Sequence, residues 1–144
     1  MFKESIHLEL KKEYVKDILK TVIAFANTSG GKIYIGIDDD GKVLGVQKLD
    51  TDILKLSNSI RDSIKPDITL FTSILVEKID GKDVIVVDVQ KGASSPYYLT
   101  DKGIRPSGVY VRQGASSVPA TDAAILKMIR DTDGDNFEEL RSLN

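Results

Sequence analysis

The first forty residues change between two hydrophobic periods, and each period predicts a different element. Over residues 6–11, apolar and polar side chains alternate, which predicts a strand with one covered face. Over residues 12–26, apolar side chains recur every three or four positions, which predicts a helix packed against a core. Alternation returns over residues 33–38 and predicts a second strand.

The rest of the chain contains two hairpin signals and two further helical patterns. Asp-Gly steps at residues 40–41 and 80–81 are typical of type I′ turns, each joining two antiparallel strands. Residues 84–87 are all apolar, so their strand is expected near the middle of the sheet. The pattern predicts a return strand at 43–46, a helix from Asp50 or Thr51 to just before Pro66, strands at 69–79 and 82–90, a loop at 92–108, a strand at 108–113, a turn at 114–119 and a helix at 121–130.

This order of elements predicts an α/β (α+β) fold. We expect a single-domain sandwich with a mixed, largely antiparallel sheet and about three helices. The domain is expected to cover residues 1–130. Residues 131–144 are expected to form a polar tail or linker that begins a further C-terminal region, with a separate helical turn over 137–143.

Composition narrows the function classes. The chain has 144 residues and no cysteine, which excludes thiol catalysis, disulfides and thiolate metal sites. It has one histidine, which excludes a histidine-rich zinc site. The sequence contains neither a long apolar run nor a signal-peptide pattern, so no membrane association is expected and the cytoplasm is the expected location. The net charge of −2 means that binding of nucleic acid requires a local basic patch.

Carboxylates near the first two strands are candidates for metal chemistry. Glu9 and Asp38 each lie on the polar face of a predicted strand, and Lys11 shares the face of Glu9. If the strands are neighbours, these groups converge into a set that suits a magnesium- or manganese-dependent phosphodiesterase. Glu4 joins them only if the N-terminus folds back. The alternative is a solvated edge with an ion pair between Glu9 and Lys11.

Residues 96–114 interleave aromatic and basic side chains. Tyr110 and Arg112 share one strand face, where tyrosine can stack on a base and arginine can bind phosphate. The equally weighted alternative is a packed tyrosine beside a structural arginine. The nucleic-acid-binding candidates are Lys11, Tyr98, Lys102, Arg105, Tyr110 and Arg112.

Two adjacent glycines, Gly30 and Gly31, follow the first predicted helix. They are candidates for a backbone anion nest. The alternative is a helix C-cap followed by tight entry into the next strand.

Several of these motifs together resemble one known family. In chain order they are Glu4 with Leu8-Glu9-Leu10-Lys11, Ala24-Phe25-Ala26-Asn27-Thr28-Ser29-Gly30-Gly31, Ile33-Tyr34-Ile35-Gly36-Ile37-Asp38-Asp39-Asp40-Gly41, Leu44-Gly45-Val46, Pro66, and Tyr110-Val111-Arg112-Gln113-Gly114-Ala115-Ser116-Ser117. They span roughly residues 4–129 and resemble the Schlafen-type AlbA-like domain, formerly called the divergent AAA domain.

The resemblance implies an N-terminal nucleic-acid-binding module of a prokaryotic transcriptional regulator or helicase-related protein. DNA is favoured over RNA as the partner, a homodimer is a second expectation, and no cofactor is expected. Vertebrate relatives that cleave RNA use two glutamates and an aspartate, which match Glu4, Glu9 and Asp38 or Asp39. The alternative functions are therefore a ribonuclease, with Glu9 and Asp38 binding magnesium or manganese, and a protein-interaction or dimerisation module.

Overall fold

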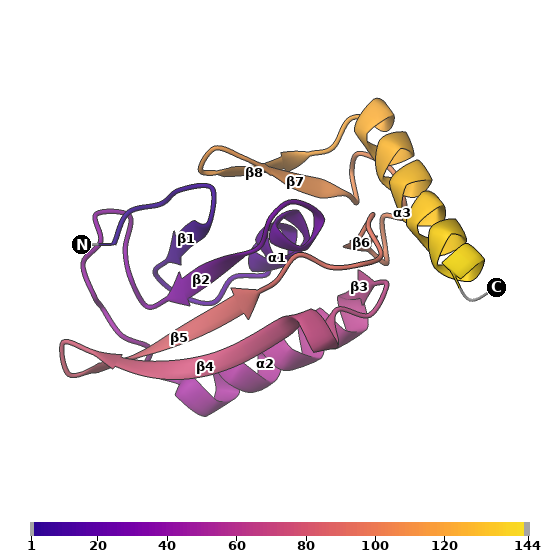
Figure 1. Ribbon diagram of the computed structural model, residues 1–144. Helices are drawn as coiled ribbons and strands as arrows, with labels where there is room; N and C mark the ends of the chain where they lie inside the picture. Colours follow the sequence, from indigo (N-terminus) through magenta and orange to yellow (C-terminus); the bar gives the residue numbers. More distant parts are fainter. Residues whose placement is uncertain (1, 143–144) are drawn as a thin grey trace.

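The computed structural model describes residues 2–142, with side chains through Gly134. A four-stranded sheet in the order β1-β2-β5-β4 forms its centre (Figure 1). These strands are β1 (Leu8–Lys11), β2 (Gly31–Ile35), β4 (Thr72–Ile79) and β5 (Lys82–Val89). β1 runs parallel to β2, and the other two pairs are antiparallel. The predicted mixed, largely antiparallel sheet is confirmed.

Two helices, α1 (Ile18–Asn27) and α2 (Leu49–Ser63), cover one face of this sheet (Figure 1). Their buried side chains share one core with Ile33 and Ile35 of β2 and with Ile85 and Val87 of β5. Nearly every residue of α1 is buried, whereas α2 fully buries only Leu56 and Ile60. The difference arises because α1 lies between the sheet and a second layer, and α2 has water on its outer side.

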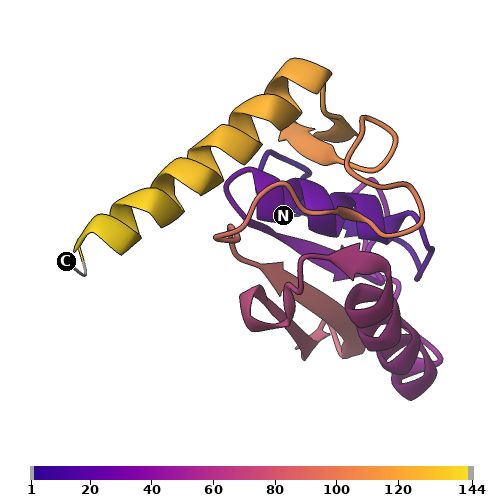
Figure 2. The same cartoon turned by 90° about the vertical axis from the view of Figure 1, so that its right-hand side faces the viewer.

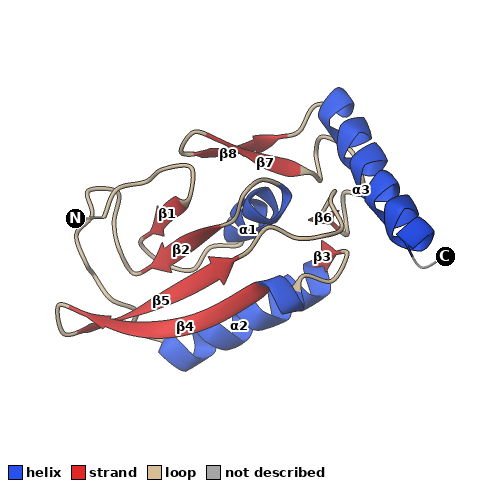
Figure 3. Ribbon diagram, viewed as in Figure 1, coloured by secondary structure: helices blue, strands red, loops and turns tan. Residues whose placement is uncertain are grey.

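The second layer is a hairpin of β7 (Tyr110–Gln113) and β8 (Ser116–Pro119), which lies across α1 from the main sheet (Figure 3). A further two-stranded sheet pairs β3 (Ile64–Lys65) with β6 (Tyr98–Leu99). Helix α3 (Asp122–Ser142) follows the hairpin, and its far end extends away from the sheet (Figure 2). No helix within residues 2–142 is long and apolar enough to cross a membrane.

The opposite face of the main sheet has a smaller core. Leu10, Val84, Ile37 and Val43 are buried together, and the last two belong to the loop between β2 and α2. Phe2 closes this core from the N-terminal side. Its ring centroid lies 4.9 Å from that of Tyr34. The N-terminal segment therefore folds back over the sheet.

Several element boundaries differ from the prediction. The turn expected at 114–119 contains β8, because Gly114, at a φ of 56°, lets the chain reverse within two residues. Residues Thr69–Phe71 form a 3-10 turn (η1) before β4 begins. The return strand expected at 43–46 is reduced to one bridge between Ile37 and Val43.

The start of α1 and the end of α3 also differ from the prediction. α1 begins at Ile18 rather than near residue 12. Tyr14, which precedes it, lies against the core, with its hydroxyl group 3.1 Å from Ser59 Oγ of α2. α3 continues to Ser142, through the expected polar tail and most of the separate turn predicted over 137–143. Leu143, the end of that turn, lies outside the described residues. The division into a domain and a linker stays a prediction.

Candidate functional site

Arg112 on β7 is the centre of the most densely connected polar cluster in residues 2–134. Its side chain is fully buried. One guanidinium nitrogen lies 2.7 Å from Glu9 Oε1 on β1. The other donates to the carbonyl oxygens of Ser5 and Leu8, at 2.8 and 3.0 Å. The guanidinium carbon also lies 4.8 Å from the centre of the Phe25 ring, a cation–π distance. Arg112 thus joins the N-terminal segment, β1, α1 and β7.

Residues at the end of α1 hold β7 in this position. The Asn27 side chain donates to the carbonyl oxygens of Tyr97 and Tyr110, both at 3.0 Å. It also accepts the Tyr97 amide proton at 2.8 Å. The next residue, Thr28, accepts the amide proton of Arg112 through its hydroxyl oxygen at 2.9 Å. The Asn-Thr pair in the sequence motif therefore satisfies buried backbone groups of two distant segments.

Glu9 and Glu4 form a proton-sharing pair beside Arg112. Burial raises the pKa of Glu9 to about 7, and a hydrogen bond with Glu4 adds to this effect against the opposing charge of Arg112. The same hydrogen bond lowers the pKa of Glu4, which also accepts the Leu10 amide proton at 3.1 Å. The structure therefore brings Glu4 to Glu9, as expected for an N-terminus that folds back.

Asp38 does not join this pair. The parallel register places Glu9 beside Ile33, on the face covered by α1, whereas Asp38 lies beyond the end of β2. Its Oδ1 accepts the amide protons of Asp40 and Lys42, at 3.0 and 2.9 Å, and so closes the hairpin turn. The prediction that Glu9 and Asp38 converge is therefore wrong. Sequence alternation identified polar faces but could not identify the register.

A hollow of about 270 Å³ lies beside the glutamate pair, and Asp39 rather than Asp38 lines it. Lys11 also lines the hollow, with its ammonium nitrogen 3.8 Å from Glu9 Oε2. Both oxygens of Glu9 thus face cationic side chains, with which a divalent ion would have to compete. No group of three potential metal ligands occurs in the part of the chain that the structure describes. The residues as placed do not fit magnesium or manganese.

The aromatic and basic candidates of residues 96–114 separate into buried and exposed groups. Tyr110 is 7% exposed and donates its hydroxyl proton to the Ser107 carbonyl oxygen, so its ring is not available for stacking on a base. Arg112 is equally unavailable to phosphate. For both residues the alternative of a packed tyrosine and a structural arginine describes the structure. Tyr98 is half-buried against Val109.

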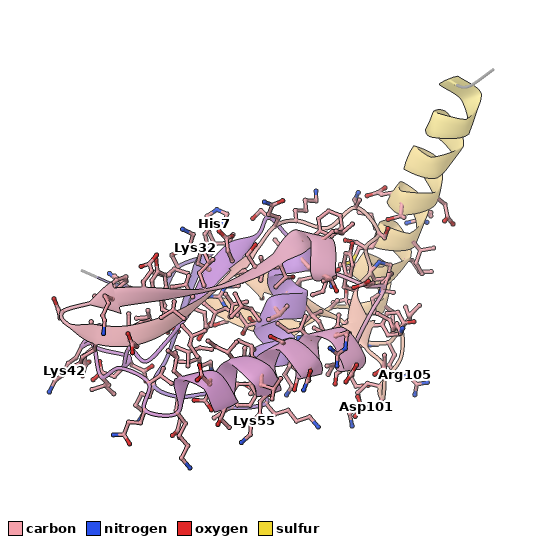
Figure 4. The ribbon with its side chains drawn as sticks, turned by 90° about the horizontal axis from the view of Figure 1, so that it is seen from below. His7, Lys32, Lys42, Lys55, Asp101 and Arg105 are labelled. Carbon is pink, nitrogen blue, oxygen red and sulfur yellow. The ribbon has the colours of Figure 1, made fainter. Side chains whose placement is uncertain are left out.

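The exposed candidates are Lys102 and Arg105. Figure 4 shows Arg105 beside Asp101 at one end of the molecule, with Lys42 at the opposite end and Lys55 on α2 between them. Lys102 lines a hollow of about 490 Å³ between the start of α1 and the loop after β6. Lys16 and Lys20 line the same hollow.

Sequence reasoning missed Lys16 and Lys20, although their spacing of four residues places them on one side of a helical turn. Lys20 lies 3.2 Å from Asp17 Oδ1, and this hydrogen bond raises the pKa of Lys20. Neither Lys16 nor Lys102 forms an ion pair with a described residue. Lys16 and Lys102 lie in the same hollow because of the position of the loop after β6, and the sequence pattern did not predict that position.

Gly30 and Gly31 serve the connection between α1 and β2. The Gly30 amide donates to the Phe25 carbonyl oxygen at 2.8 Å. Gly30 has a φ of 77°, the left-handed conformation that is common where a helix ends. A Cβ atom at Gly31 would lie 2.6 Å from the Phe25 ring and 2.8 Å from the His7 carbonyl oxygen. These contacts favour the helix C-cap and tight strand entry over the anion nest.

Comparisons with known proteins agree with this fold. The N-terminal domain of a protein from Nitrosomonas europaea, described as related to the ATP-dependent DNA helicase RecG, is 24% identical with a TM-score of 0.59. The match covers 84% of this chain and 83% of that domain. The DIP2311 protein from Corynebacterium diphtheriae is 22% identical with a TM-score of 0.65. That match covers 85% of this chain but only 23% of DIP2311. At these identities the likeness establishes the fold.

The family assignment comes from the sequence. A family model described as Schlafen, AlbA_2 matches residues 2–121, which include the Glu4–Glu9 pair, the Asn-Thr motif at the end of α1 and the buried Arg112. The match covers well over half of the chain, and the resemblance noted from the motifs is confirmed. The chain belongs to the Schlafen AlbA_2 family.

Proposed function

We propose that this chain is a nucleic-acid-binding module, that DNA is its preferred partner, and that it acts within a transcriptional regulator. One observation carries the proposal: three lysines from segments about eighty residues apart in the sequence line one hollow. The RecG-related description of the Nitrosomonas protein adds support for DNA, because that name refers to a DNA helicase.

The charge balance of the hollow favours an anionic ligand. Lys16, Lys20 and Lys102 face two aspartates, Asp17 and Asp101, and Asp17 is already paired with Lys20. Lys16 and Lys102 are exposed and can each bind a phosphate group with little loss of protein contacts. Because the whole chain carries a net charge of −2, such a local cluster is what attraction to a polyanion requires.

The proposal is tested by the salt dependence of binding. We expect the wild-type protein to bind duplex DNA at low ionic strength, with fluorescence anisotropy as the measurement. The double variant Lys16→Glu/Lys102→Glu should bind more weakly. It should also reduce the slope of log K against log salt by about 2, since each phosphate contact contributes about 0.9 on B-DNA.

A second double variant, with the same change in net charge but at lysines outside the hollow, is the matched control. Lys42→Glu/Lys55→Glu alters two exposed lysines that do not line the hollow. If both double variants lose the same affinity, net charge rather than the hollow governs binding. Absence of salt-sensitive binding by the wild-type protein would reject the proposed function. A single-stranded RNA of matched length, measured in parallel, tests the preference for DNA.

A further inference from the structure

The outer edge of β4 is an unpaired sheet edge of unusual regularity. β4 ends the strand order β1-β2-β5-β4, so it has a hydrogen-bonded neighbour on one side only within the described chain. It has eight residues and contains neither proline nor glycine. Its register with β5 continues without interruption from Thr72 to Ile79. Natural proteins rarely leave such an edge uncovered, because it pairs readily with another strand.

The hairpin after β4 defines which backbone groups face outward. Asp80 and Gly81 both have positive φ and form a two-residue turn, and Ile79 is paired with Lys82. In such a hairpin the residues that flank the turn exchange hydrogen bonds with each other. Backbone groups at odd positions of β4 therefore point toward β5. Those at even positions, including Ile74 and Val76, point to the free edge.

The side chains of β4 are apolar in the middle and polar on both sides. Leu75 is 52% exposed and Val76 is 44% exposed, although both belong to the sheet. Thr72 and Ser73 precede this apolar centre, and two charged residues, Glu77 and Lys78, follow it. The pattern polar–polar–apolar–apolar–apolar–polar–polar is symmetric about Leu75, which is the symmetry that a two-fold antiparallel pair requires.

We propose that β4 pairs antiparallel with β4 of a second copy of this chain, on a two-fold axis at Leu75. The two four-stranded sheets would then form one continuous sheet of eight strands. Leu75 lies opposite Leu75 of the second copy in a non-hydrogen-bonded pair, where Cα atoms are about 4.5 Å apart. Ile74 lies opposite Val76 of the second copy, and the outward backbone groups of these two residues exchange hydrogen bonds.

Charge and polarity select this register over its neighbours. With the axis at Leu75, Ser73 lies opposite Glu77 of the second copy and Thr72 lies opposite Lys78, so each charged group meets a hydroxyl. An axis at Val76 would place Leu75 opposite Glu77. An axis at Glu77 would place two glutamates directly opposite each other, and directly opposed like charges are destabilising. A second copy thus offers this edge a strand whose apolar and polar positions match its own.

Sedimentation equilibrium tests the association. We expect the wild-type chain to form a dimer as its concentration rises through the micromolar range. Leu75→Lys should remain monomeric, because two ammonium groups would meet on the axis. Leu126→Lys, at an exposed position of α3, is the matched control and should dimerise like the wild type. A monomeric wild-type chain, or a dimer that survives Leu75→Lys, would overturn the proposal.

Disulfide cross-linking tests the register independently of that substitution. The chain has no cysteine, so a cross-link reports only the introduced residue. Leu75→Cys should form a covalent dimer on mild oxidation faster than Val76→Cys, and Glu77→Cys should be slowest. Equal rates at the three positions, or a faster rate at Val76 or Glu77, would reject the axis at Leu75.

Discussion

The guanidinium group of Arg112 lies 2.7 Å from the carboxylate of Glu9, although the two residues are 103 positions apart in the chain. The arginine is fully buried and the glutamate side chain is 11% exposed. Burying a single unpaired charge costs far more than burying a matched pair. This pair therefore makes the position of β7 depend on the position of β1, across the intervening helix α1.

We predict that at pH 8, where Glu9 is ionised, Arg112→Met destabilises the fold by about 3–5 kcal/mol, the usual effect of removing one partner from a buried ion pair. The substitution also removes one of the donors to each of the carbonyl oxygens of Ser5 and Leu8. Urea unfolding followed by circular dichroism measures the change. Arg105→Met, at an exposed position, should alter stability by no more than about 0.5 kcal/mol. Similar stabilities for the two variants would contradict a structural role for Arg112.

The raised pKa of Glu9 predicts that stability falls as the pH rises. Between pH 4.5 and about 7, the folded protein keeps a proton on Glu9 that the unfolded chain has released. The folded state therefore loses about 1–3 kcal/mol of relative stability across this interval. Glu9→Gln keeps a neutral group that hydrogen-bonds Glu4, and its stability should be nearly independent of pH in the same interval. Urea midpoints measured at several pH values test this.

Glu13→Gln is the control for that titration, because Glu13 lines the same hollow but is exposed. It should retain the pH dependence of the wild type. A wild-type stability that does not change between pH 4.5 and 7 would mean that Glu9 ionises normally.

Divalent ions should not stabilise the protein through the glutamate pair. Glu9 already faces Arg112 and Lys11, so Mn²⁺ would have to compete with both cations to bind. We predict that millimolar Mn²⁺ leaves the thermal midpoint unchanged at neutral pH, since only a ligand bound to the folded state raises it. RNA incubated with Mn²⁺ should be cleaved equally slowly by the wild type and Glu9→Gln. Glu9-dependent cleavage would show that the cluster rearranges into a metal site.

The same substitution should have opposite effects at two glycines. Gly31→Ala forces a Cβ atom against the Phe25 ring and the His7 carbonyl oxygen, and should destabilise by about 1–3 kcal/mol. Gly134 lies within α3, where an added Cβ atom would meet open space, so Gly134→Ala should increase helix stability by up to about 1 kcal/mol. Thermal unfolding distinguishes the two. Destabilisation by Gly134→Ala would indicate that α3 is not helical there.

The main sheet was predictable because its strands carry strong local signals. The alternation over residues 33–38 and the apolar run at 84–87 come from side chains that face a core on one or both sides. The Asp-Gly turn at 80–81 defines the neighbouring hairpin by backbone geometry alone. Because each of these signals lies within a short segment, a single sequence was sufficient to predict the strands.

The site was less predictable because its chemistry depends on register and layering. Arg112 and Tyr110 alternate with valines, and that pattern is the same whether the polar face meets water or α1. Only the second layer across α1 reveals that this face is buried. Glu9 and Asp38 were separated by a register that alternation does not determine. Lys102 was predicted as a candidate, but Lys16 and Lys20 were missed, because their proximity to Lys102 depends on the position of a long loop.

Within residues 2–142 the β7–β8 hairpin belongs to no larger sheet, and side chains at the end of α1 hold it in place of backbone ladders. Several contacts together therefore hold the hairpin against the rest of the fold. Asn27 and Thr28 contribute at one end, and Arg112 contributes through its contacts with the N-terminal segment. Loss of any one contact weakens the anchoring of the whole hairpin rather than fraying it residue by residue. We therefore expect the hairpin to open as a separate unit, so that its amide protons exchange with solvent while the main sheet remains intact. A substitution of Asn27 in α1 would then increase the exchange rates of amide protons in the hairpin, more than eighty residues further along the chain.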